Sequence, residues 1–246
     1  METTACSRNS RLSLAFVYII MPTGKITALR AQSHDSQRVN VFIDDVFAIG
    51  VSLNTVVREN LFVGKEVDAS AWNRLETVES ADKALQAALR FLETRPRSIT
   101  EVRERLRRKA FGETSIEAAI TRLTDLELLD DNAFAQFWVE NRLACRPRGA
   151  RALRDELRRK GVAGSIVEST LANNELMADD SERALTLARA ALRKYRDAPD
   201  RFNFQRRMGG YLQRRGFDFD TITPILDLLW KELQSETEEV SRATNQ

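Results

Sequence analysis

A short basic segment occurs twice in this chain at a fixed distance. LRRKAF begins at Leu106 and LRRKGV begins at Leu157, 51 residues later, and a looser copy, LQRRGF, begins at Leu212. Pro96 precedes Pro147 by the same 51 residues. Self-similarity at such a period is typical of helical repeat proteins, in which each repeat buries its apolar face against its neighbours. The sequence therefore predicts three tandem repeats.

Each repeat is expected to hold three helices. In the first repeat the apolar periodicity predicts helices over residues 82–93, 99–109 and 115–127, with counterparts in the second repeat. Pro96 and Pro147 cannot continue a helix, so they are expected to follow the ends of the helices before them.

Three short motifs predict where helices begin. SITE at Ser98, TSIE at Thr114 and SIVE at Ser165 each place a Ser or Thr three residues before a Glu. In a capping box of this kind the hydroxyl accepts from a free backbone amide, and the Glu reaches back to the amide of the capping residue. We predict a helix start at each of the three positions.

The middle helix of each repeat combines an apolar stripe with a basic end. Val102 and Leu106 lie four residues apart, which places them on one helical face, and equivalent apolar pairs recur in the other two repeats. This stripe is the predicted core. The basic residues that lie largely away from it are our candidate partner-binding residues: Arg103, Arg107, Arg108, Lys109, Arg154, Arg158, Arg159, Lys160, Arg214 and Arg215.

Two interpretations of these basic residues remain open at this stage. Cations near the C-terminus of a helix are favoured by its dipole, so the residues can simply form solvated helix ends. Stacked repeats would also present the basic ends several times along one surface, which suits binding to an acidic partner at several points. The pattern alone does not choose between the two.

The chain before the repeats has the periodicity of strands. From Lys25 to Val51 it alternates with period two, and Val39, Val41 and Ile43 share one face. We predict three short strands, a tight hairpin at FIDDVF and a helix at SLNTVVREN. The expected fold class is mainly α, with tandem three-helix repeats in an elongated curved array after a small β-rich N-terminal domain.

These patterns also predict the domain boundaries. Arg8 and Arg11 precede an apolar run that is too short to span a membrane, so the first twenty residues are expected to be either a disordered extension or the product of an upstream start codon. The predicted segments are a disordered extension over 1–22, the β-rich domain over 23–78, repeats over 82–130, 131–178 and 179–233, and a flexible tail over 234–246.

Composition narrows the possible functions. Lys and Arg number 38 against 36 Asp and Glu, so the chain has no strongly basic arm for nucleic acid. Cys6 and Cys145 lack metal-ligand spacing and fit a reducing cytoplasm. His34, the single histidine, lies in a polar stretch and offers no catalytic triad. We therefore predict no catalytic residue, no metal and no cofactor.

Two longer runs resemble a known family. RPRSITEVRERLRRKAF and LDDNAFAQFWVENRLACRPRGARALRDELRRKGV are similar to the RecX family, bacterial regulators of the RecA recombinase. The resemblance covers about residues 82–230, and RVNVFIDDVFAIGVSL with LFVGKEV resembles the small N-terminal region of some members. The chain departs from the family pattern in its longer N-terminus and its divergent third repeat.

One family pattern includes an acidic pair and aromatic residues. It falls on Asp130, Asp131, Phe134, Ala135, Trp138, Val139 and Arg142. We interpret most of these residues as structural, with Asp130 or Asp131 capping a helix and the aromatic side chains filling the repeat core. A second acidic pair, Asp179 and Asp180, stands 49 residues after the first, which favours capping over metal binding.

The resemblance implies a function that the residue patterns alone do not. It implies a cytoplasmic, non-enzymatic monomer that lies in the groove of the RecA filament on DNA and bridges neighbouring RecA subunits. Such a protein would inhibit strand exchange or promote filament disassembly, with a role in recombination, DNA repair and the SOS response. The alternative is a sequence-neutral DNA-binding module that acts by occupying phosphates. Weak DNA binding is expected in either case.

Overall fold

The computed structural model describes residues 22–33, 35–173 and 180–244, with side chains of the last helix described up to residue 236. His34, Asp179 and residues 1–21 of the extension predicted over 1–22 lie outside these residues. The chain divides into two compact units, and the division falls after Glu79.

The first unit contains a four-stranded antiparallel sheet. Its strands are β1 (Gly24–Gln32), β2 (Asp35–Ile43), β3 (Val46–Ser52) and β4 (Glu66–Val67), in the order β3-β2-β1-β4. The first three strands were predicted. β4 was missed because only two residues pair with β1, which is too short for an alternating pattern to be recognised.

Local chemistry fixes the ends of these strands. At the predicted hairpin, Asp44 and Asp45 have φ values of 47° and 64°, in the left-handed region that two-residue hairpin turns require. The helix predicted after the sheet is α1 (Leu53–Arg58), and the Ser52 hydroxyl caps it by accepting from the Thr55 amide. Both predictions are confirmed.

The sheet is covered on one face by apolar side chains. The predicted inward row of β2, Val39, Val41 and Ile43, is buried. Val41 and Ile43 belong to a cluster with Trp72 and Leu75, which lie on the first part of α2 (Ala69–Leu92). The sheet and the start of α2 therefore form one small core.

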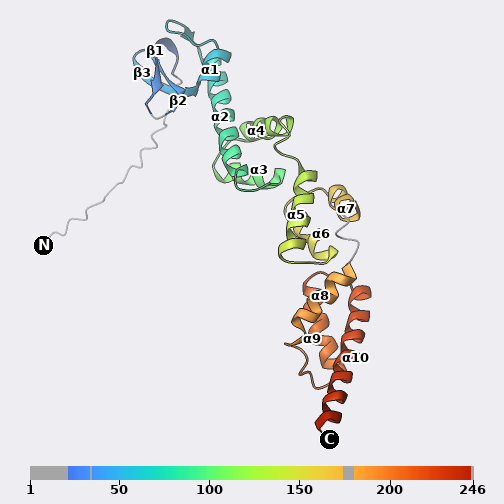
Figure 1. Cartoon of the computed structure of the whole chain (residues 1–246). Coiled ribbons are helices and arrows are strands. Elements are labelled where there is room, and N and C mark those ends of the chain that lie inside the picture. Colours follow the sequence, from blue (N-terminus) through green and yellow to red (C-terminus); the bar gives the residue numbers. More distant parts are fainter. Residues whose placement is uncertain (1–21, 34, 174–179, 245–246) are drawn as a thin grey trace, which may run out of the picture. The chain divides into compact units, whose positions relative to one another are not determined.

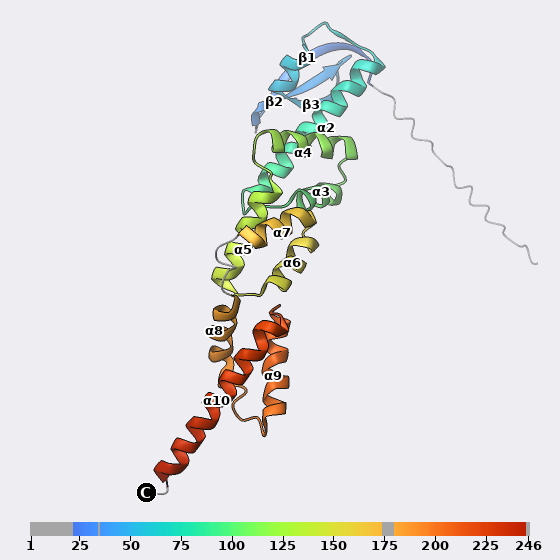
Figure 2. The same ribbon diagram turned by 90° about the vertical axis from the view of Figure 1, so that its right-hand side faces the viewer.

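The three tandem three-helix repeats are confirmed (Figure 1). The first contains the end of α2, α3 (Ile99–Arg108) and α4 (Glu113–Asp125). The second contains α5 (Asp131–Cys145), α6 (Ala150–Arg159) and α7 (Gly164–Asn173), and the third contains α8 (Asp180–Leu192), α9 (Arg201–Arg214) and α10 (Phe219–Thr244). Figure 2 shows α10 beside α8 and α9, both of which it contacts.

Each repeat has its own apolar core. The buried residues of the three clusters fall within 84–129, 134–171 and 184–233, so these clusters do not interleave along the chain. The predicted stripes of the middle helices lie at the centre of these clusters, and all six residues are fully buried: Val102, Leu106, Leu153, Leu157, Met208 and Leu212.

The predicted capping box at Ser98 is confirmed. Its hydroxyl accepts from the Glu101 amide, and the Glu101 carboxylate accepts from the Ser98 amide. The acidic pair also caps helices. Asp130 caps α5, and Asp131 Oδ1 accepts from the amide of Ile99 at 2.9 Å, at the start of α3.

The helix starts predicted at Thr114 and Ser165 are confirmed to within one residue, but the capping boxes predicted there are wrong. α4 begins at Glu113 and α7 begins at Gly164, so both hydroxyl residues lie within the first turn. The glutamates of the two motifs accept hydrogen bonds from arginines of the preceding helix instead of capping their own helix.

The last helix extends beyond its predicted end. The helical pattern was expected to stop at Leu233 and to be followed by a flexible tail, but α10 continues to Thr244. Residues 234–244 contain no Gly or Pro that would end a helix. The fall in apolar content after Leu233 therefore does not mark the end of the helix.

Candidate partner-binding surface

Four of the ten candidate residues are engaged in ion pairs across the helices of their own repeat. Arg103 donates two hydrogen bonds to Glu117, at 2.9 and 3.1 Å, and Arg107 donates two to Glu113, at 3.1 and 2.6 Å. The side-chain hydrogen bonds to Arg107 and to Arg103 lower the pKa values of Glu113 and Glu117 respectively.

The second repeat uses the same arrangement. Arg154 donates two hydrogen bonds to Glu168, at 2.9 and 3.1 Å. These two residues lie 51 positions after Arg103 and Glu117 respectively. Arg158 contacts the same carboxylate at 3.2 Å. These arginines join the second helix of a repeat to its third helix, and their charges are largely neutralised within the chain.

Three other candidates are more available to a partner. Arg108 is exposed and approaches only Glu104, at 3.8 Å. Lys109 is exposed and has no ion pair within the described residues. Arg159 is exposed and donates through Nε to the carbonyl of Asp155. The candidate surface therefore reduces in these two repeats to three exposed cations that donate no hydrogen bond to a carboxylate of the described residues.

Lys160 belongs to the junction between the first two repeats. Its ammonium group donates to Glu101 at 2.6 Å and lies 4.8 Å from the centre of the Trp138 ring. The Ser98 hydroxyl donates to the Lys160 carbonyl at 2.6 Å. The side chain and the backbone of this residue thus both join the second repeat to the capping box of the first.

Glu101 is the central counterion of this junction. Its carboxylate accepts from Arg95 at 2.9 and 3.2 Å as well as from Lys160. Burial opposes ionisation of Glu101, but the hydrogen bonds from these two cations outweigh that effect and lower its pKa to about 2. One carboxylate therefore neutralises two cations that come from different repeats.

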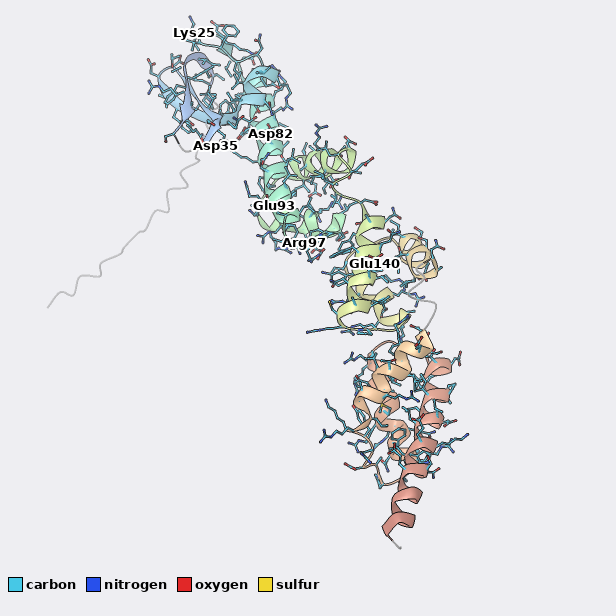
Figure 3. All side chains as sticks on the ribbon, viewed as in Figure 1. Lys25, Asp35, Asp82, Glu93, Arg97 and Glu140 are labelled. Carbon is cyan, nitrogen blue, oxygen red and sulfur yellow. The ribbon has the colours of Figure 1, made fainter. Side chains whose placement is uncertain are left out.

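We expect the free energy of unfolding of the Glu101→Gln variant to fall less at acidic pH than that of the unaltered chain. The folded-state pKa of Glu101 lies below its ordinary value of 4.5, so its contribution is fully present above pH 4.5 and is lost as the pH falls towards about 2. Urea denaturation between about pH 7 and pH 2.5 should show a shallower decline for the variant. Glu140→Gln is the control, because Glu140 is exposed on α5 and has no ion pair within the described residues (Figure 3). An equal decline of the free energy of unfolding with falling pH in both variants would contradict the role of Glu101 as the counterion of this junction.

Arg214 and Arg215 lie at the junction between the second and third repeats. They line a cavity of about 340 Å³ together with Arg146, Arg148 and Tyr211. Arg146 and Arg148 were not among the predicted residues. A signal for them is present in the sequence, because RPRS at 95–98 and RPRG at 146–149 share the 51-residue period.

Family comparisons agree with this organisation. Family models described as Regulatory protein RecX N-terminal domain and as the first, second and third three-helix domains of RecX match residues 24–68, 84–123, 130–171 and 178–226. The regulatory protein RecX of Bacillus subtilis (strain 168) is 30% identical over 213 residues, which are 87% of this chain and 80% of that protein. The chain belongs to the RecX family. Its relatives carry the name of a regulatory protein, which supports a regulatory role.

Other RecX proteins show the same similarity in sequence and in fold. The regulatory protein RecX of Clostridium botulinum (strain Eklund 17B / Type B) is 29% identical over 203 residues, 82% of this chain and 94% of that protein. A crystal structure of regulatory protein RecX matches with a TM-score of 0.69 and 25% identity, covering 82% of this chain and 98% of that one. The RecX structure from Lactobacillus salivarius matches with a TM-score of 0.53 and 28% identity, over 62% and 97% of the two chains.

No helix among the described residues is both long enough and apolar enough to cross a membrane.

Proposed function

We propose that this RecX family member binds the RecA recombinase filament on DNA and inhibits its ATP hydrolysis and growth. Membership of a family of regulatory proteins is the observation that carries the proposal. The repeats support it, because a helical polymer offers the same surface many times, and several weak contacts reinforce one another when they can form together. We expect the chain to act in the cytoplasm as a monomer and without chemistry of its own.

The proposal is tested by titrating the chain into the cognate RecA while DNA-dependent ATP hydrolysis is measured. Inhibition should appear well below one copy per recombinase, because one regulator then affects many subunits of a polymer. Inhibition that appears only when the chain saturates the DNA would favour the alternative, in which the chain occupies phosphates. ATP hydrolysis by the chain without RecA would contradict a purely regulatory role.

The exposed cations should contribute more to filament binding than the paired arginines. We expect replacement of Arg108, Lys109 and Arg159 by Gln to weaken binding by about tenfold at moderate salt, since within the described residues none of these cations is hydrogen-bonded to a carboxylate. Inhibition curves at two salt concentrations measure the effect. The matched control replaces Arg103, Arg107 and Arg154 by Gln, which removes the same number of charges from the same helices.

The control triple variant should lose less affinity, because its three arginines are held by Glu117, Glu113 and Glu168. Equal losses would show that only net charge matters and that no local contact forms. Unchanged binding in both variants would remove the basic helix ends from the interface.

A further inference from the structure

The two junctions between repeats are built from equivalent positions but differ in where their carboxylates lie, because Glu101 corresponds to Ala152 and Arg105 corresponds to Glu156. Arg95 lies 51 residues before Arg146. Lys160 is the fourth residue of the basic segment LRRKG, and Arg215 is the fourth residue of the equivalent segment LQRRG. Both junctions therefore bring together the first arginine of an Arg-Pro-Arg motif and the fourth residue of the basic segment in the next repeat. Glu101, which neutralises both cations at the first junction, corresponds to Ala152 at the second.

Within the described residues, the second junction consequently has no carboxylate at the position that Glu101 occupies in the first. Four arginines line the 340 Å³ cavity. Arg148 lies 3.1 Å from Glu156, a carboxylate that also pairs with Arg142. Arg146, Arg214 and Arg215 have no ion pair within the described residues. Arg215 lies over the ring of Tyr211, at 5.1 Å from its centre, and this contact leaves its charge uncompensated.

The backbone holds these like charges together. The Gly149 amide donates to the Arg215 carbonyl at 3.0 Å. A Cβ on Gly149 would lie 2.3 Å from the carbonyl oxygen of Gly216, so only glycine allows the two segments to approach this closely. The contact fixes Arg146 and Arg148 beside the C-terminal end of α9. Like charges that line one cavity repel one another, so an anion bound between them would stabilise the junction.

A neighbouring cavity extends the positive surface. It has a volume of about 310 Å³ and shares Arg214 with the first cavity, and it is lined by Arg151, Ala152, Asp155, Arg159, Gln213, Arg214 and Gly216. Ala152 lies in its wall, so a carboxylate at this position would enter the region between the two sets of arginines. Among the described residues, Asp155 is the single acidic residue that lines either cavity.

We propose that the junction between the second and third repeats binds a phosphate group, which takes the place that the Glu101 carboxylate has at the first junction. A single carboxylate satisfies Arg95 and Lys160 there, whereas three arginines that have no ion pair within the described residues line one cavity here. Phosphate presents more acceptor oxygens than a carboxylate and matches the planar fork of arginine. The group can belong to a free phosphate compound or to the backbone of single-stranded DNA, and the two sources differ in how they bind.

The test uses the purified full chain without RecA, so its outcome is independent of the proposed regulatory function. Calorimetry measures binding of inorganic pyrophosphate, and fluorescence anisotropy measures binding of an oligothymidylate of about 20 nucleotides. Ala152→Glu supplies the missing carboxylate and should weaken binding by about tenfold or more. Ala118→Glu is the matched control, because it adds the same charge at an exposed position of α4 that lines neither cavity, and it should change affinity less than about twofold.

A second variant tests whether the arginines themselves bind the phosphate group. Replacement of Arg146 and Arg215 by Gln should weaken binding as much as Ala152→Glu does, and circular dichroism should confirm that each variant is folded. Oligothymidylate that binds more tightly than pyrophosphate and competes with it would identify the DNA backbone as the source of the phosphate. Pyrophosphate that binds as tightly as the oligonucleotide would identify a free phosphate compound. Equal weakening by Ala152→Glu and Ala118→Glu, or no binding of either probe to the unaltered chain, would overturn the proposal.

Discussion

Replacing Gly149 with alanine should lower the free energy of unfolding by about 3 kcal/mol or more. The added Cβ would lie 2.3 Å from the Gly216 oxygen, 2.6 Å from its carbonyl carbon and 2.7 Å from the amide nitrogen of Phe217. All three are backbone atoms, so no side-chain rotation can relieve the overlap. The junction must open, and the hydrogen bond from the Gly149 amide to Arg215 must break.

Gly164→Ala is the matched control for this variant. Both glycines lie at the start of a helix of the second repeat, but a Cβ on Gly164 would meet no atom within 4 Å. Stability should therefore change by no more than about 0.5 kcal/mol. Urea denaturation of the two variants measures the difference. Similar stability for both would show that the second and third repeats do not depend on this backbone contact.

Phe204→Ala should destabilise the third repeat by about 3 to 5 kcal/mol and leave the first repeat folded. Phe204 is fully buried among α8, α9 and α10, and its ring lies 5.5 Å from that of Trp230. Because the first repeat buries a separate set of side chains, the loss is not transmitted to its core. Amide hydrogen exchange should show lost protection over residues 180–233 and retained protection in α3 and α4.

Phe202→Ala provides a control in the same helix. Its side chain is 72% exposed, two residues before Phe204, so its removal should cost less than about 0.5 kcal/mol. Protection lost evenly over all three repeats in Phe204→Ala would show that the second unit unfolds in a single cooperative step. Equal destabilisation by both variants would contradict the assigned core of the third repeat.

Much of the fold could be predicted from periodicity. The apolar pair four residues apart in the middle helix of each repeat identified three buried stripes, because core-facing residues of a helix must recur at helical spacing. The capping box at Ser98 was predicted because all of its partners lie within four residues. At Thr114 and Ser165 the same local motif failed, since Glu117 and Glu168 contact arginines of another helix. A pattern of four residues holds no information about such a contact.

The candidate surface shows the same limit. The basic segments could be found from the sequence. How many of their charges a partner can reach depends on carboxylates of the next helix, which lie 6 to 14 residues further along the chain. The cavity at the second junction depends on positions separated by more than sixty residues, Arg146 and Arg214, which approach through two glycines. Whether the selected cations contact a partner stays a prediction.

The separate cores also have a consequence for the synthesis of the protein. Every apolar cluster closes within about fifty consecutive residues, in the β-rich domain as well as in each repeat. Contacts between residues close in sequence form quickly, because little chain entropy is lost when they meet. A ribosome that has released one repeat has therefore already released every residue that the core of that repeat requires. Each unit can fold during translation, before the next one is complete.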